Sequence, residues 1–373
     1  MSLPLLTYNP GILGDEELTR SFVVRQESLE LALEALRENA ASQAMNRHLL
    51  VVGPRGIGKT MLARRVAAEV RSNPAYGSRW YPLVFGEESY PVSTPGEFWL
   101  EALFHLAEQT GEGQWKKGVE ELRREPDEAR LRERALGQLL DFAHQEDKRL
   151  LLVVENLNML LGEQMDQDSA WVLRHALTNQ PRLMLLGTAT TRFEETSNVD
   201  RAWFEMFSMH ELKPLDPEEC RTLWLSAAGA SLEPSPLRAI RILTGGNPRL
   251  LTILAGFAAN RSFRELMDHL VQLIDDHTEY FKSHLDGLAA RERKVFVGLL
   301  DHWDPVGAAE LAGLTRLGVN EVSSLLGRLV DRGAVEVVER KPRRKLYQAA
   351  ERLYNIYYLM RRRGIRRAGS APR

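Results

Sequence analysis

Cysteine is nearly absent from this sequence, and several other signals are missing as well. Cys220 is the only cysteine among 373 residues, so the chain can form neither an internal disulfide nor a cysteine metal site. None of the nine histidines falls in an HExxH or similar spacing. No apolar run approaches the length of a membrane span, and no secretory signal pattern opens the sequence. We therefore expect a cytoplasmic protein that does not interact with membranes.

A strong charge bias is also missing. The sequence holds 49 Lys and Arg against 51 Asp and Glu, a formal net charge of −2. A balance this close to neutral does not by itself predict binding to nucleic acid, so any such affinity must come from local patches. The length is sufficient for two or three domains, each with its own core.

One stretch, His48 to Thr60, carries the clearest chemical pattern. A short apolar run ends at a glycine, and the loop Gly-Pro-Arg-Gly-Ile-Gly-Lys-Thr then leads into a helical pattern. Glycines let successive backbone N–H groups turn inward around anionic oxygens, and the positive end of the following helix points at the same place. We assign nucleotide contacts to Gly53, Pro54, Arg55, Gly56, Ile57, Gly58, Lys59, Thr60 and Met61.

Within this P-loop, two side chains have chemical tasks. Lys59 would reach the β- and γ-phosphates of ATP, and the Thr60 hydroxyl would bind Mg²⁺. The alternative, a chance match of four specified positions, becomes less plausible because a strand pattern precedes the loop and a helix pattern follows it. The sequence therefore predicts a site for ATP and Mg²⁺.

A second apolar run, residues 149–154, ends in Glu155 and Asn156 and is typical of a Walker B strand. In the usual Asp-Glu pattern the first carboxylate holds Mg²⁺ and the second polarises the attacking water. Here Glu155 takes the metal position and Asn156 the base position. An amide cannot act as a general base, so nucleotide binding is expected while rapid hydrolysis is in doubt. A buried strand with a solvent-facing polar end is the alternative.

The stretch between these two motifs shows a rise in charge density. Residues 80–85 read as a strand and residues 95–109 as a helix. From residue 111 to 134 charged residues become denser and the apolar pattern thins. We expect this stretch to be a solvated excursion with a short helix.

Several segments resemble AAA+ ATPases of the origin-recognition and archaeal-ATPase type. Phe22-Val23-Val24-Arg25 resembles an F-[VI]-G-R-E segment that precedes the P-loop in that family, with valine in place of the glycine and Gln26 in place of the glutamate. The resemblance implies that Val24 and Arg25 lie beside the adenine. It also implies that Thr188, or as second choice Thr190, is the sensor 1 residue that reads the γ-phosphate.

The same resemblance implies two functional arginines. Arg201 matches the arginine finger that a subunit offers to its neighbour's nucleotide, with Arg192 as a rival and an exposed, salt-bridging arginine as the structural alternative. Gly246-Asn247-Pro248-Arg249 resembles sensor 2 of the helical lid, in which Arg249 would reach the γ-phosphate. Asn247 by itself reads as a helix N-cap and Pro248 as a first-turn residue.

The last ninety residues change character. Three helix patterns are followed by two strand patterns that flank a basic turn, which predicts a winged helix. Its third helix would enter a DNA major groove and its wing would contact phosphate, unless the module binds protein instead. The candidate DNA contacts are Asn320, Ser323, Ser324, Arg328, Arg343 and Arg344. A helix with Tyr354 and Tyr357, expected to dock on this module, and a basic tail that includes Arg361, Arg362 and Arg363 come last.

The patterns predict an α/β core and a helical C-terminal part, and the resemblance implies a P-loop AAA+ parallel sheet with a helical lid, followed by an α+β winged-helix domain. We expect the nucleotide-binding core in residues 1–215, the lid in 216–284 and the winged helix with its basic tail in 285–373. The leading hypothesis is a nucleotide-dependent ATPase switch that acts on double-stranded DNA, as a homo-oligomer or with a partner protein. The alternative resembles STAND signalling NTPases, in which the winged helix mediates autoinhibition or protein contact.

Overall fold

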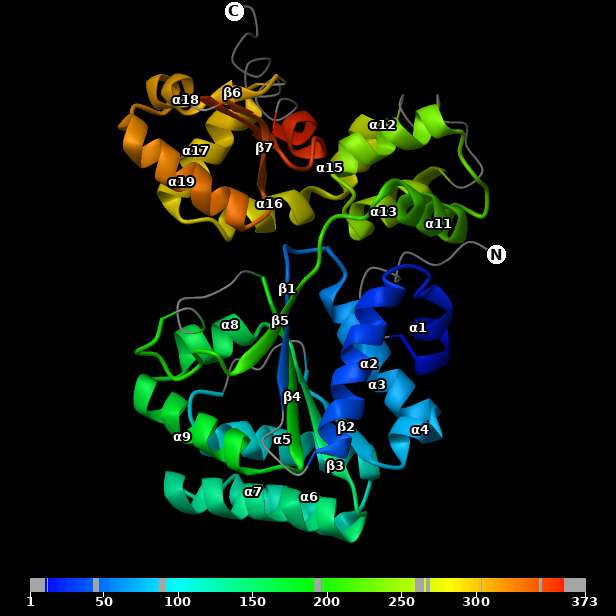
Figure 1. The fold of residues 1–373 in the computed structure, drawn as a ribbon, viewed down its shortest axis with the longest axis vertical. Helices are drawn as coiled ribbons and strands as arrows, with labels where there is room; N and C mark the ends of the chain where they lie inside the picture. Colours follow the sequence, from blue (N-terminus) through cyan, green and yellow to red (C-terminus); the bar gives the residue numbers. More distant parts are fainter. Residues whose placement is uncertain are drawn as a thin grey trace, which may run out of the picture. The chain divides into compact units, whose positions relative to one another are not determined.

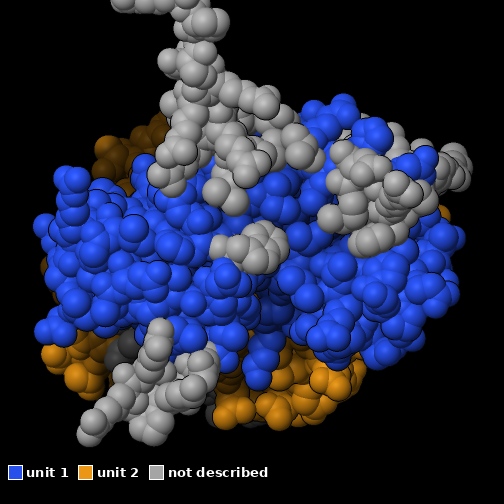
Figure 2. Space-filling model, turned by 90° about the horizontal axis from the view of Figure 1, so that it is seen from above, with its two compact units in different colours: residues 1–6, 54–57, 213–373 blue, residues 7–53, 58–212 orange. Residues whose placement is uncertain are grey.

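The structure is a computed structural model of the whole chain. It describes residues 11, 13–42, 47–86, 92–190, 196, 198–258, 265, 269–302, 304–341 and 344–358. The chain divides into two compact units, coloured in Figure 2. Unit 2 comprises residues 7–53 and 58–212, and unit 1 comprises residues 1–6, 54–57 and 213–373. Within the described ranges, no helix is both long enough and apolar enough to span a bilayer.

A five-stranded parallel sheet forms the centre of unit 2 (Figure 1). Its strands are β1 (His48–Val52), β2 (Trp80–Val84), β3 (Arg149–Val154), β4 (Leu183–Ala189) and β5 (Phe207–Glu211). The spatial order is β2-β3-β4-β1-β5, so the strand before the P-loop lies between β4 and β5. β1 is buried along its full length, as expected for a strand covered on both faces. The P-loop therefore leaves the sheet from an interior strand.

Helices cover both faces of this sheet. On one face Figure 1 shows α1 (Asp15–Ser21), α2 (Gln26–Ala41), α3 (Lys59–Ser72) and α4 (Pro74–Gly77). The other face carries α5 (Pro95–Thr110), α6 (Gly113–Leu122), α7 (Glu128–Gln145), α8 (Leu157–Met159), the π-helix η3 (Leu160–Gln164) and α9 (Gln167–Asn179). Side chains alternate between the faces along each strand, and the predicted α/β fold is confirmed.

The short helix expected within residues 111–134 is present as α6, but the expectation that the stretch is a solvated excursion is wrong. α6 and the first half of α7 occupy it, and Trp115, Val119 and Leu122 of α6 are buried in the core of unit 2. These three residues recur at i, i+4 and i+7, which places them on one face of a helix. The high charge density belongs to the opposite face of the same helices, where it obscures the apolar stripe.

In unit 1 a group of helices precedes a small sheet. The first helices are α11 (Pro217–Ala228), α12 (Pro234–Thr244), α13 (Pro248–Ala258), α15 (Leu270–Asp276) and α16 (Thr278–Asp286). They begin where the sequence places strong start signals: Asp216 caps α11 through the amides of Glu218 and Glu219, each at 2.8 Å.

Three further helices and a three-stranded antiparallel sheet complete unit 1. The elements are α17 (Ala290–Leu300), β6 (Val306–Gly307), α18 (Ala308–Thr315), α19 (Val319–Asp331), β7 (Val335–Lys341) and β8 (Arg344–Ala349). The sheet order is β6-β8-β7, with a bulge between Val337 and Glu339. This arrangement is that of a winged helix. Tyr354 and Tyr357 are buried among rings of α16 and α17, as expected for core residues.

Candidate functional site

The P-loop begins where β1 ends. The amide of Gly53 donates to the carbonyl of Ala189 on β4 (3.1 Å), which anchors the start of the loop to the sheet. Gly56 and Gly58 have φ values of +79° and +101°, a region that residues with a Cβ rarely adopt. The predicted glycines therefore lie at the two positions where the backbone must turn.

Lys59 is the first residue of α3 and only 8% exposed. Its Nζ donates to the Gly53 carbonyl at 2.6 Å, across the mouth of the loop. The ammonium is therefore held beside the loop backbone, not in bulk solvent. A phosphate entering the loop would meet this charge.

Thr60 and Glu155 lie together although 95 positions separate them in the sequence. The Thr60 hydroxyl donates to Oε2 of Glu155, and the Glu155 side chain is buried at the end of β3. A hydroxyl and a carboxylate are oxygen ligands of the kind that Mg²⁺ prefers, so these two residues fit the ion that accompanies a nucleotide. Arg64, which the sequence reasoning missed, has its Nε 3.6 Å from Oε1 of Glu155. Its spacing of four from Thr60 on a helix was the available signal.

Asn156 follows Glu155 in the left-handed conformation, with φ +52° and ψ +41°. Asparagine is among the few residues that tolerate this region, which gives the unusual Walker B residue a local structural reason. Its backbone N–H donates to Oγ1 of Thr188, the expected sensor 1 position on β4, at 3.3 Å. Thr190, the second choice, donates through its amide to Oδ1 of Asn158 at 3.3 Å. The ends of β3 and β4 are thus linked by hydrogen bonds.

Arg25 lies beside the P-loop. It has φ +66° as the N-cap of α2 and is 9% exposed. A Cβ added to Gly58 would lie 3.6 Å from Nε of Arg25, so the guanidinium borders the loop. Val24 precedes it and is partly buried. The structure therefore brings this segment to the phosphate loop.

Arg201 lies in a turn that precedes β5 and is partly buried. Its Nη1 donates to Oε1 of Gln167 at the start of α9, at 3.2 Å. Its predicted role as an arginine finger, offered to the nucleotide of a neighbour, depends on a second subunit. The rival Arg192 lies outside the described residues.

Within unit 1, the turn before α13 contacts the P-loop residues that belong to the same unit. Nδ2 of Asn247 donates to the Arg55 carbonyl at 3.1 Å, and the amide of Arg249 donates to the Gly56 carbonyl at 3.2 Å. The Arg249 guanidinium lies 5.0 Å from the ring centroid of Tyr280, a cation–π contact. Arg249, the expected sensor 2, is thus joined to the P-loop through its backbone.

The sequence reasoning missed Glu351, just after β8. Its carboxylate accepts hydrogen bonds from Nδ2 of Asn247 and from the Tyr280 hydroxyl, the latter at 3.4 Å. Burial raises the pKa of Glu351 from its ordinary value of 4.5 to about 8. No local pattern around Glu351 could have signalled this, because the carboxylate meets Asn247 only through tertiary packing.

The candidate DNA-contacting residues on α19 are exposed: Asn320, Ser323, Ser324 and Arg328. Nη1 of Arg328 lies 3.9 Å from the buried carboxylate of Glu292 on α17. α19 itself carries two acidic residues and one basic residue. Of the wing residues, Arg343 lies outside the described residues, and only the backbone of Arg344 is described. The tail arginines also lie outside the described residues. The face of α19 is therefore accessible but not basic.

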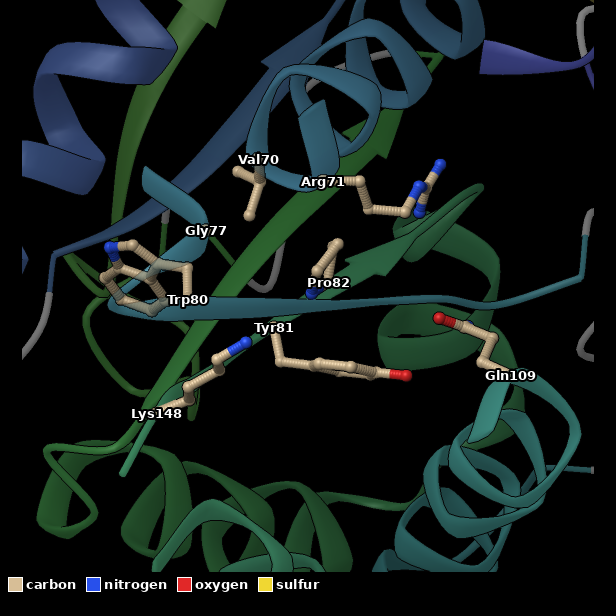
Figure 3. A pocket seen from close by; sticks show the side chains of 8 residues that line it. All are labelled: Val70, Arg71, Gly77, Trp80, Tyr81, Pro82, Gln109 and Lys148. Carbon is tan, nitrogen blue, oxygen red and sulfur yellow. The ribbon is translucent and has the colours of Figure 1, made fainter. Parts of the chain in front are cut away.

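A separate hollow of about 490 Å³ lies at the edge of the unit 2 sheet (Figure 3). It is lined by Val70, Arg71, Gly77, Trp80, Tyr81, Pro82, Gln109 and Lys148. None of the candidate site residues lines it. The hollow is therefore separate from the P-loop site.

Comparison with known proteins bears on the P-loop and β3. Residues 21–186 match the family described as the AAA ATPase domain. This region is similar to an AAA ATPase domain. The match contains β1, the P-loop, Glu155 and Asn156, and it ends within β4. No curated protein sequence matches the chain at a significant level.

Solved structures extend the likeness in fold over most of the chain. The Walker-type ATPase PABY2304 of Pyrococcus abyssi aligns with a TM-score of 0.63 at 13% identity, covering 90% of this chain and 96% of that one. The Aeropyrum pernix ORC1 protein, solved in complex with DNA, aligns with a TM-score of 0.48 at 16% identity, covering 97% of both chains. At these identities the likeness to the P. abyssi protein shows the fold, and the ORC1 alignment is too distant to support an argument.

Proposed function

We propose that this protein binds Mg·ATP at the P-loop and works as a nucleotide-dependent switch. The observation that carries the proposal is the meeting of Thr60 and Glu155 beside a P-loop whose Lys59 is already held at its mouth. Loop amides and Lys59 would hold the phosphates, while Thr60 and Glu155 would hold Mg²⁺. The metal would supply charge neutralisation between the phosphates.

Hydrolysis is slow in this proposal because the base position holds Asn156. Its side-chain amide cannot accept a proton from water at neutral pH. The preceding carboxylate, Glu155, accepts a hydrogen bond from the Thr60 hydroxyl and lies near Arg64. A bound nucleotide would therefore persist and act as a signal.

Three further residues have roles in this switch. Thr188 would sense the γ-phosphate; its Oγ1 accepts a hydrogen bond from the backbone N–H of Asn156 at the end of β3. Arg249 would contribute as sensor 2 from the lid, which we place in residues 216–284. Arg201 would complete the site of a neighbouring subunit in an oligomer.

We further propose that the switch acts on double-stranded DNA through the winged helix, residues 285–373. The exposed polar face of α19 supports this, with Asn320, Ser323 and Ser324 available to base edges. Arg328, Arg343 and Arg344 would add phosphate contacts, which are needed because α19 has little positive charge of its own.

A second candidate is a signalling switch in which the winged helix restrains the P-loop. Two observations favour it. A Cβ on Gly333, just before β7, would lie 3.0 Å from Cγ of Pro54, so the winged helix packs against the P-loop tip within unit 1. Arg328 is also directed toward Glu292, within its own domain. Here the output would be a protein contact.

Single-turnover hydrolysis of radiolabelled ATP, with and without duplex DNA, tests the proposal and separates the candidates. The DNA switch predicts slow hydrolysis that DNA changes by at least several-fold, together with DNA binding that weakens steeply with salt. A protein that retains ADP through purification and does not bind DNA at low salt would support the signalling switch. Fast, multiple-turnover hydrolysis without a partner would contradict both.

A further inference from the structure

The turn between α12 and α13 is built for close approach. Gly245 and Gly246 have φ values of +61° and +72°, and a Cβ on Gly246 would lie 2.7 Å from the Leu215 carbonyl oxygen. Asn247 follows and is only 2% exposed. A buried asparagine must have its donors and acceptors satisfied, so its hydrogen bonds define what the turn does.

One half of the Asn247 amide performs the expected capping. Its Oδ1 accepts from the amides of Arg249 and Leu250, at 3.0 and 3.4 Å, at the start of α13. The other half is not needed for capping. Nδ2 donates to the Arg55 carbonyl in the P-loop at 3.1 Å and to the Glu351 carboxylate. Because backbone N–H donors face Oδ1 and oxygen acceptors face Nδ2, the orientation of the side-chain amide is fixed.

The bond to Arg55 has a consequence for phosphate binding. In a trans peptide the C=O and the next N–H point in opposite directions. Holding the Arg55 carbonyl toward Asn247 therefore turns the Gly56 N–H to the other side of the loop. A P-loop binds phosphate with N–H groups turned inward in this way. Gly56 must be glycine here, because its Cβ would lie 2.8 Å from Oδ1 of Asn247.

We propose that Asn247 is a positioning residue for the phosphate loop, and that Glu351 fixes the orientation of its amide. Nucleotide affinity then depends on how the segment after β8 is seated. The inference rests on the proposed nucleotide binding and adds a regulatory route to it, from the winged helix through Glu351 and Asn247 to the Gly56 N–H. The phosphates are sensed through the loop backbone, with no winged-helix side chain required at the nucleotide.

The test measures Mg·ADP affinity of the full chain by calorimetry. Asn247→Asp keeps the Oδ1 cap but replaces the Nδ2 donor with an oxygen that faces the Arg55 carbonyl. We expect an affinity loss of at least about ten-fold. Asp216→Ala is the matched control, because it removes the cap of α11 in the same unit without touching the P-loop. It should lower the melting temperature and leave the affinity unchanged.

A pair of variants at Glu351 keeps the test informative if Asn247→Asp folds poorly. Glu351→Gln retains an acceptor oxygen for Nδ2 and should bind Mg·ADP within about two-fold of wild type. Glu351→Ala removes that acceptor and should lose about three- to ten-fold. Rescue by the amide but not by alanine is a result that loss of packing alone would not give.

The outcomes distinguish the inference from the function on which it rests. Wild-type protein that does not bind Mg·ADP or Mg·ATP overturns the proposed function itself. Wild-type binding together with unchanged affinity in folded Asn247→Asp, or in both Glu351 variants, overturns the positioning role alone. An equal loss in Asp216→Ala would also overturn it, because general weakening of the lid would then explain the effect.

Discussion

Replacing Glu351 with glutamine should change how the stability of unit 1 depends on pH. Burial raises the pKa of this carboxyl to about 8 in the folded protein, against 4.5 ordinarily. Between these values the folded state keeps a proton that the unfolded chain releases, so the free energy of unfolding falls as pH rises. The free energy of unfolding can change by at most about 1.4 kcal/mol per pH unit, which sets a ceiling of about 5 kcal/mol between the two pKa values. Since Glu351 is partly exposed, solvent screening reduces this, and we expect about 2–3 kcal/mol.

Glu351→Gln imitates the protonated form and should remove this slope. The two proteins should be similarly stable at pH 5, and the variant should be the more stable one at pH 8.5. The neighbouring phenols of Tyr280 and Tyr354 do not titrate in this range, because burial raises their pKa values well above 10. Arg249 and His284 are common to both proteins, so the difference between them isolates Glu351.

Cys220 provides the assay. It is the only cysteine, is fully buried in α11 and lies in unit 1. Its labelling by a pyridyl disulfide in a urea series therefore reports the unfolding of this unit at each pH. Glu310→Gln, an exposed substitution on α18, is the control and should follow wild type. If Glu351→Gln also follows wild type from pH 5 to 8.5, the buried carboxyl does not have the raised pKa and the reasoning is refuted.

Three other predictions concern the site and its sheet. Gly56→Ala should weaken Mg·ADP binding by well over ten-fold in calorimetry, because φ is +79° and the new Cβ would crowd Asn247. Gly137→Ala is the control, since the space around Gly137 is open, and it should have no effect on binding. Equal affinities for Mg·ADP in the two variants would contradict the account. Asn156→Glu should speed single-turnover hydrolysis by about 10²-fold by restoring a general base, and unchanged hydrolysis at unchanged affinity would show that the base is not what is missing. Burial lowers the pKa of His48 to about 4, so the contribution of His48 to stability is present above pH 6.5 and is lost as pH falls toward 4. His48→Asn keeps an acceptor for the Leu185 amide and should flatten the fall of the unfolding free energy on the acid side. If that fall persists in the variant, it arises from other groups.

The sequence was sufficient for features whose signal is local. The P-loop, the strand before Glu155 and the third helix of the winged-helix pattern follow from apolar period and glycine placement, and the structure contains all three, the last as α19. α6 was missed because charged residues on its exposed face obscured a buried stripe. Hydrogen bonds between residues far apart in the sequence could not be predicted. Asn247 and Arg55, for example, are separated by 192 positions, and only tertiary packing brings them together. Sequence pattern gave Asn247 a capping role, and its second role needed the fold.

The most direct test of the central claim is a calorimetric titration of wild type and Lys59→Ala with Mg·ATP. The account requires wild-type binding, and it requires that removing the ammonium beside the Gly53 carbonyl weakens binding by at least about a hundred-fold while the fold is retained. Far-ultraviolet circular dichroism and the melting temperature serve as the check on folding. Equal affinity for Mg·ATP in the two folded proteins would contradict the assignment of the nucleotide to this loop.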